Sequence, residues 1–206
     1  MNVAGLVQLC QSSHPANYFH PLGIDSAVAS AHTPCSPDQL SSMLISILQN
    51  SLAPTDGIAA GIAFRAARVG SLETLPALSH SLSRLPPSTR AASLQMGQHL
   101  WGISRRWPWA LPVHQQVDPL TSSTDLHHAL AFGTLASETT SSQLRAIATC
   151  LFNTARNIVL AACRAIPLPE SAGQKVLSDL QPAITELAAR CADRDVSEII
   201  IPGLPE

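Results

Sequence analysis

Charged residues are scarce in this chain of 206 residues: Asp, Glu, Lys and Arg together make up 13% of it, whereas about 25% is usual in a soluble domain. Lysine is nearly absent, since Lys175 is its single occurrence and arginine carries the rest of the positive charge. The formal net charge of −2 argues against the basic surface with which a nucleic-acid-binding domain contacts phosphates. We therefore expect no nucleic-acid partner.

The low content of charged residues bears on whether part of the surface is buried against a partner. Apolar residues reach 46% of the chain, although aromatic residues account for only 4%. Such a chain can bury part of its surface against another protein. A surface rich in Ser, Thr and Gln is the alternative, and the sequence supplies those residues too. Composition alone leaves both interpretations open.

Membrane and secretion signals are also missing. No unbroken apolar run approaches the ~20 residues that a bilayer-spanning helix needs. The first residues, MNVAGLVQLCQSS, contain no Lys or Arg, which a secretory signal peptide would place there. The cysteines are odd in number and include no C-x-x-C pair: Cys10, Cys35, Cys150, Cys163 and Cys191. We expect reduced thiols in a cytoplasmic protein, with no membrane partner and no structural zinc site.

Strand signals are nearly absent, apart from the short Glu-Ile-Ile-Ile stretch before Pro202. Apolar residues recur instead at the i, i+3, i+4, i+7 spacing of core-facing helices. The pattern predicts helices from Pro37 onward to a stop at Gly70, and over residues 72–82, 88–103, 124–137, 142–164 and 172–191, with a short one over 24–31. The segments RRWPWALP and VDPLTSST are expected to form a proline-rich connection.

These elements predict an all-α fold, a single-domain helical bundle of about 7–9 helices. Residues 1–35 are dense in Pro, Ser and Asn, and we expect them to form an irregular segment packed on the domain. Residues 36–206 are expected to form the helical domain itself.

The stretch RAIPLPESAGQKVL, residues 164–177, interrupts two apolar helical patterns. Pro167 disfavours helical backbone at the residue before it, so the first helix should end near Arg164. Ser171 and Gln174 have the spacing of a capping box for the next helix, and Pro182 should kink or restart that helix. Local effects leave Arg164 and the Pro-Leu pair unexplained.

The same region resembles the signature of the urease accessory protein UreF family. That signature reads Asn, a short apolar run, Ala-Ala and then R-L-x-P-L-G-Q-x-x-G-Q. The family's first Gly-Gln is replaced here by Pro169 and Glu170. The positions that match are Asn157, Ala161, Ala162, Arg164, Pro167, Leu168, Gly173 and Gln174.

Two further stretches resemble family motifs, in the expected order. TRAASLQMGQHL is similar to the R-x-x-S-x-x-x-G helix through Arg90, Ser93 and Gly97, and HHALAFGTLA to the H-x-x-x-x-G element through His128 and Gly133. Near the N-terminus, HPANYFHPLGID resembles a divergent form of P-x-G-G-F-x-x-S-x-G-L-E. The Arg-Leu-Phe tail typical of the family has no counterpart in the last residues of this sequence.

The resemblance implies an all-α protein without catalytic residues, cofactor or resident metal. Members of the family join UreD (also called UreH), recruit the GTPase UreG and assist nickel delivery to the urease apoprotein. The resemblance therefore implies these partners and leaves a homodimer open. It implies partner-binding roles for Arg164, Pro167, Leu168, Gly173, Gln174, Arg90, Ser93, Gly97, His128 and Gly133.

Each of these positions also has a structural interpretation. Arg164 can offset the negative end of a helix dipole. Arg90, Ser93 and Gly97 share one helix face, on which a glycine, costly inside a helix, favours close packing. His128 fits a hydrogen-bonded histidine of the core.

Two other functions remain open. One is a UreF-like interaction or ligand-binding module that does not act on urease. The other is a small helical hydrolase that uses His128 with Asp125 or Glu138. The sequence contains no H-E-x-x-H helix, nucleophile–base pair or phosphate loop that would support this enzyme.

Histidines supply the candidate metal ligands. His14 and His20 share a loop with Asp25, and imidazole nitrogens are suitable ligands for nickel. Loop histidines are common, however, so the pattern is weak. His127 and His128 are adjacent, and neighbouring helical side chains diverge too far to share one ion.

Overall fold

The computed structural model describes residues 2–11, 36–120, 125–165 and 169–201. The short helix expected over residues 24–31 lies outside these ranges. Within them the chain forms helices joined by short connections, and no residue is assigned to a strand. The stretch Glu-Ile-Ile-Ile ends in extended chain rather than in a strand. The all-α prediction is confirmed for the described residues.

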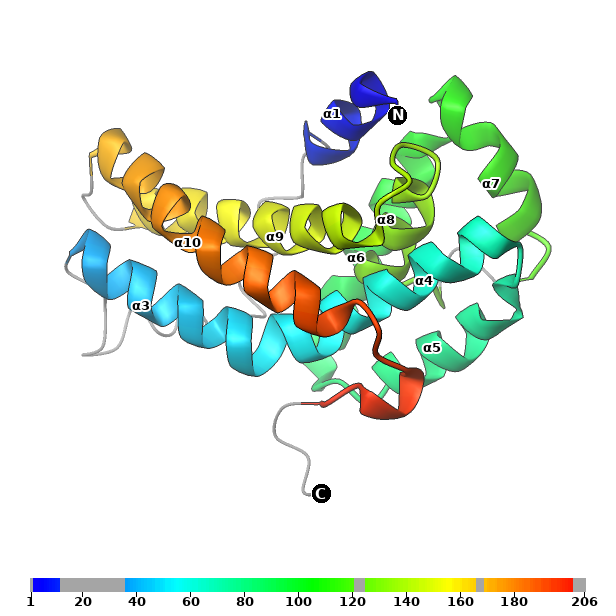
Figure 1. Ribbon diagram of the computed structural model, residues 1–206, viewed down its shortest axis with the longest axis horizontal. Coiled ribbons are helices and arrows are strands. Elements are labelled where there is room, and N and C mark those ends of the chain that lie inside the picture. Colours follow the sequence, from blue (N-terminus) through cyan, green and yellow to red (C-terminus); the bar gives the residue numbers. More distant parts are fainter. Residues whose placement is uncertain (1, 12–35, 121–124, 166–168, 202–206) are drawn as a thin grey trace.

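Figure 1 shows the arrangement of the helices. In chain order, they are α1 (Val3–Gln11), α3 (Pro37–Ile47), the π-helix η2 (Leu48–Gly57), α4 (Ile58–Val69), α5 (Leu75–Leu82), α6 (Pro87–Ser104), α7 (Leu111–Val117), α8 (His128–Ala136), α9 (Gln143–Ala165) and α10 (Glu170–Cys191). Single turns of 3-10 helix lie at η3 (Leu72–Thr74), η4 (Pro108–Ala110) and η6 (Val196–Glu198).

The core forms around α8, in which every residue from His128 to Ala136 is buried. Helices α4, α6 and α9 pack against it. Outside this layer, α10 lies between α9 and α3, and Figure 1 shows these three running side by side. An apolar cluster extends through both layers, so burial of apolar surface holds the helices together.

The chain passes from α3 through η2 into α4 without a break. Pro54 lies inside η2, where it cannot donate a backbone hydrogen bond. Two donors from distant parts of the chain bond to carbonyls of this π-helix. The Cys191 thiol donates to Ala53 O at 3.2 Å, and the Ile200 N–H donates to Pro54 O at 3.1 Å. The sequence pattern predicted helix here but gave no sign of the π geometry.

Helix α1 occupies residues that were expected to be irregular, so that prediction is wrong over residues 3–11. Asn2 starts the helix because its side chain accepts a bond from the Gly5 N–H at 2.9 Å. The Asn2 N–H donates to Thr139 O, after α8, at 2.8 Å. Trp109 Nε1 also donates to Gln8 Oε1 at 2.7 Å. A helix this short is marginal alone, and these tertiary bonds stabilise it.

Helix α7 and η4 interrupt the expected proline-rich connection. Pro112 lies in the first turn of α7, where a missing N–H costs nothing. The His114 ring lies against Trp101, with ring centroids 4.1 Å apart. His114 Nε2 lies 2.9 Å from Ser104 Oγ, and Trp101 Nε1 donates to Asp118 at 2.9 Å. These contacts with α6 stabilise the helical segment. The local sequence pattern does not indicate them.

Helix α10 corrects two expectations. It begins at Glu170 with Pro169 at the N-cap position and no side-chain cap, so Ser171 lies within the first turn and the predicted Ser171–Gln174 capping box is wrong. Pro182 lies inside the helix, which continues to Cys191, so the helix does not restart at this proline. The alternative expectation, a kink at Pro182, stays a prediction. Packing against both α9 and α3 outweighs the backbone bond that Pro182 removes.

Candidate docking site

Two of the motif segments meet where α6 packs against the start of α8. A Cβ atom at Gly97 would lie 1.8 Å from Leu126 O and 2.7 Å from the carbonyl carbon of His127. A Cβ at Gly133 would lie 2.2 Å from Ala60 O, where α8 crosses α4. No side chain fits at such distances, so both glycines allow main chain to touch main chain.

Ser93 and Arg90 reinforce the same junction. Ser93 Oγ lies 3.1 Å from His127 Nδ1 and accepts a bond from the His128 N–H at 3.4 Å. Arg90 Nη1 donates to Ser83 O, just after α5, at 2.8 Å. Burial, and to a lesser extent the charge of Arg90, lower the pKa of His127 to about 4. His127 is therefore a neutral, structural imidazole near neutral pH.

His128 is a core histidine by location. Its side chain is 1% exposed, and its ring lies 5.9 Å from that of Phe132. Asp125 is exposed, and Glu138 lies beyond the far end of α8, roughly 15 Å along the helix at 1.5 Å per residue. An imidazole that is 1% exposed has little access to a substrate, which a general base must reach.

Helix α9 ends at Ala165, one residue after Arg164, as the following proline predicted. Pro167 and Leu168 lie outside the described residues, as does the side chain of Arg164. Beyond this corner, Gly173 of α10 faces α9 so closely that a Cβ would lie 3.0 Å from Cys163 Sγ. Gln174, the next residue, is exposed. Within the described part of the corner, Gly173 therefore serves packing and Gln174 faces solvent.

Some apolar residues of α9 are exposed outside its buried face. On the buried face, Ile147 is 0% exposed and Leu151 1% exposed. Elsewhere around the helix, Leu144 is 41% exposed and Leu160 44% exposed, and Phe152 is half-buried. The periodicity of the sequence indicates a helix, but not that the described elements leave these side chains partly uncovered.

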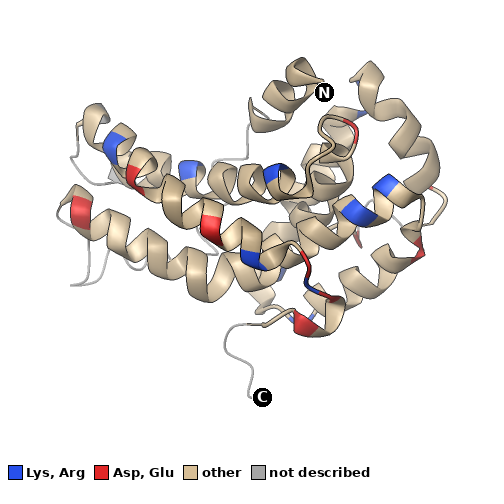
Figure 2. Cartoon of the chain, viewed as in Figure 1, with Lys and Arg blue, Asp and Glu red and all other residues tan. Residues whose placement is uncertain are grey.

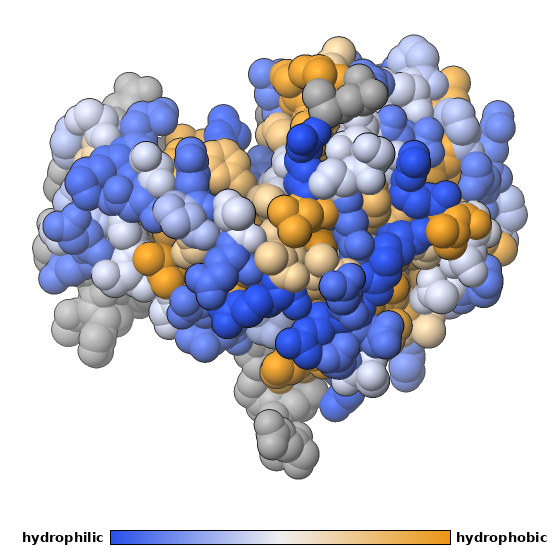
Figure 3. All heavy atoms as spheres, viewed as in Figure 1, coloured by the Kyte–Doolittle hydropathy of each residue, from blue (hydrophilic) through white to orange (hydrophobic). Residues whose placement is uncertain are grey.

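A groove of about 410 Å³ lies along α9 at Phe152, and we call it the α9 groove. Ala148, Phe152 and Ile184 give it apolar surface, and Arg145 is its charged residue. Cys10 of α1 closes one side, while Gln181 and Thr185 of α10 form another. Figure 3 shows the surface hollowed beside α1, with apolar colours inside the hollow. Such a groove fits apolar side chains of another protein.

The described residues contain no group of three His, Cys, Asp or Glu side chains that could hold a metal ion. The candidate ligands His14, His20 and Asp25 lie outside those residues, as does Cys35. The described cysteines are free thiols: Cys10, Cys150, Cys163 and Cys191. Cys150 is fully buried, and this burial raises the pKa of its thiol.

The stretch Gln143–Cys163 in α9 is long and apolar enough to cross a membrane by length and composition alone. Arg145 and Arg156 interrupt this stretch, so it contains no long unbroken apolar run. In the structure 61% of its most apolar window is buried inside the protein, which is the usual state of a core helix.

Comparison with known proteins identifies the family. The UreF family model matches residues 35–181. The urease accessory protein UreF of Paenarthrobacter aurescens is 32% identical over 183 residues, which cover 87% of this chain and 79% of that protein. The UreF of Geobacillus kaustophilus is 27% identical over 198 residues, which cover 94% of this chain and 86% of that protein. The chain therefore belongs to the UreF family of urease accessory proteins.

Proposed function

We propose that this chain is a non-catalytic, cytoplasmic scaffold that joins UreD (UreH), recruits the GTPase UreG and assists GTP-dependent nickel insertion into the urease apoprotein. Membership of the UreF family supports this proposal. The structural observation that carries it is the α9 groove, an apolar surface that no described element covers.

The energetics of the groove favour a protein partner. Burial of the exposed part of Phe152 in this groove would stabilise a complex by about 1 kcal/mol, at ~25 cal/mol per Å² of apolar surface. Figure 2 shows few charged residues along α9, so little charge would lose its hydration on association. These features resemble the apolar centre of an interface.

The motif positions divide into two groups under this proposal. Ser93, Gly97 and Gly133 hold α6, α8 and α4 together, so they act on partner binding through the shape of the domain. We propose direct partner contact for Gln174, which is exposed, and for the neighbouring positions Arg164, Pro167 and Leu168.

Co-expression tests this function. The chain is produced with UreD-type and UreG-type proteins from the same genome, and the complexes are separated by size-exclusion chromatography and analysed for nickel. We expect the three proteins to elute together and Arg164→Glu to weaken that complex without changing the melting temperature. A wild-type chain that assembles with neither protein would instead favour a UreF-like module that does not act on urease.

A further inference from the structure

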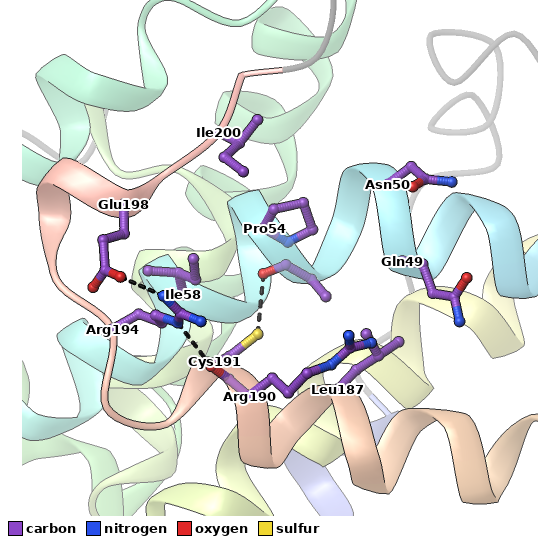
Figure 4. A pocket seen from close by; sticks show the side chains of 11 residues that line it. Gln49, Asn50, Pro54, Ile58, Leu187, Arg190, Cys191, Arg194, Glu198 and Ile200 are labelled. Carbon is purple, nitrogen blue, oxygen red and sulfur yellow. Dashed lines mark hydrogen bonds and ion pairs between the residues drawn. The ribbon is translucent and has the colours of Figure 1, made fainter.

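A second pocket, of about 450 Å³, lies where the end of α10 meets η2 and residues 198–200 (Figure 4). No family motif identified in the sequence falls within it. Pro54, Ile58, Leu187 and Ile200 give it apolar walls, while Gln49 of η2 and Arg190 of α10 contribute polar groups. The pocket therefore combines a surface for an apolar side chain with donors for an acidic group.

The two arginines at the end of α10 differ in how far they are already engaged. Arg194 Nη1 pairs with Glu198 at 2.5 Å, and its Nε donates to the Arg190 carbonyl at 3.2 Å. Arg190 is 56% exposed, and its guanidinium lies 3.9 Å from Glu186, too far for a hydrogen bond. Among the described residues, none accepts a hydrogen bond from the Arg190 guanidinium, so its N–H groups are available to a ligand. Figure 4 shows Arg190 extending beside Leu187.

The charge balance limits what can bind. Glu198 pairs with Arg194 at 2.5 Å, whereas Glu186 is 3.9 Å from Arg190 and does not line the pocket. Of the described lining residues, Arg190 is therefore the cation whose charge is less closely paired. A single carboxylate matches one guanidinium, with which it can form two parallel bonds. A phosphate carrying nearly two negative charges would require a second available cation.

The cysteine of the pocket has a structural role. Cys191 donates its thiol hydrogen to Ala53 O at 3.2 Å, and burial raises its pKa to about 11. The protonated thiol is a weak nucleophile and a weak metal ligand. The pocket is thus suited to recognition through charge and apolar contact.

We propose that this pocket binds a peptide segment of a protein partner in which a carboxylate lies beside an apolar side chain. The carboxylate pairs with Arg190, Gln49 donates a further hydrogen bond, and the apolar side chain packs on Ile58, Leu187 and Ile200. This inference rests on the proposed docking function, since it names the chemistry by which one partner is held.

Peptide binding to the full chain tests the inference directly. The probe is N-acetyl-Leu-Glu amide, compared with the neutral N-acetyl-Leu-Gln amide, and binding is followed by NMR titration. We expect the acidic peptide to bind about tenfold more tightly than the neutral one, as a charge-assisted bidentate pair allows. Arg190→Gln should abolish this difference, whereas Arg106→Gln, at an exposed arginine outside the pocket, should preserve it.

Equal binding of the two peptides, or a preference that survives Arg190→Gln, would overturn the inference, as would no binding of either. The proposed function fails separately, when the wild-type chain forms no complex with UreD-type or UreG-type proteins. If those complexes form and peptide binding shows no dependence on Arg190, the docking function stands and this pocket has no part in it.

Discussion

Gly97 of α6 lies directly against the carbonyl oxygen of Leu126, which a Cβ at position 97 would approach to 1.8 Å. The obstacle is main chain and cannot rotate aside, so α6 or the segment before α8 would have to move. We expect Gly97→Ala to lower the free energy of unfolding by about 3 kcal/mol, in the upper range for overpacked cores. Urea denaturation measures this change.

Gly102 provides the matched control in the same helix. A Cβ there would meet nothing within 4 Å. Gly102→Ala should therefore raise the free energy of unfolding by about 0.5–1 kcal/mol, the usual gain of alanine over glycine in a helix. If both alanine variants changed stability in the same direction, the close contact of Gly97 would be refuted.

His127 should make stability depend on pH. Its pKa is lowered to about 4 in the folded state from an ordinary 6.5, chiefly by burial. The unfolded chain therefore binds the proton more readily, and stability should fall as the pH decreases from 6.5 towards 4. We expect a loss of about 1–3 kcal/mol from this group. Urea unfolding at several pH values should show a shallower decline for His127→Asn than for wild type.

Asp56 should act in the opposite direction. Burial raises its pKa from 3.8 to about 6, although a bond from Thr55 partly offsets this. The folded state therefore retains the proton, and stability should rise as the pH falls from 6 to 4. Asp56→Asn should stabilise the protein by about 1 kcal/mol at pH 8, and this gain should disappear near pH 4. Asp193→Asn, at an exposed position, should show no such trend.

Arg65 should anchor the end of α10. Its guanidinium donates to Ala192 O and to Arg194 O at 2.7 Å, and Gln143 also donates to Ala192 O. Arg65→Met should lower the free energy of unfolding by about 1–3 kcal/mol, because these carbonyls lose a charged donor. Arg84→Met, at an exposed arginine, serves as the control. Equal thermal denaturation midpoints for the two variants would contradict this role.

The fold was largely predictable where local sequence and packing agree. Gly70 ends α4 with a φ of 74°, as the sequence indicated. Ser36, a residue type favoured at helix starts, caps α3 by accepting from the Gln39 N–H at 3.2 Å. Helices α1 and α7 were not predicted because tertiary contacts stabilise them. The π geometry of η2 was not predicted because its carbonyls accept hydrogen bonds from Cys191 and Ile200, which are distant in the sequence.

The site was less predictable than the fold. The Ser-x-x-x-Gly spacing pointed correctly to a close-packed helix face at Gly97, because glycine inside a helix has few other justifications. Periodicity could not show that the described elements leave the α9 groove uncovered, since exposure depends on which elements pack there. Arg190 and Gln49 share a pocket although about 140 residues separate them, and no local pattern connects the two.

The α9 groove is the central claim, and one comparison tests it most directly. Ala148→Glu places a charge in the α9 groove, and Leu111→Glu places one at a leucine of α7 that is 47% exposed. Each variant is co-expressed with a UreD-type partner, and the recovered complex is quantified. We expect Ala148→Glu to reduce recovery at least about tenfold, by burying a charge at ~1.4 kcal/mol or more, while Leu111→Glu matches wild type. Undiminished recovery with Ala148→Glu would contradict the assignment of this groove as the docking surface.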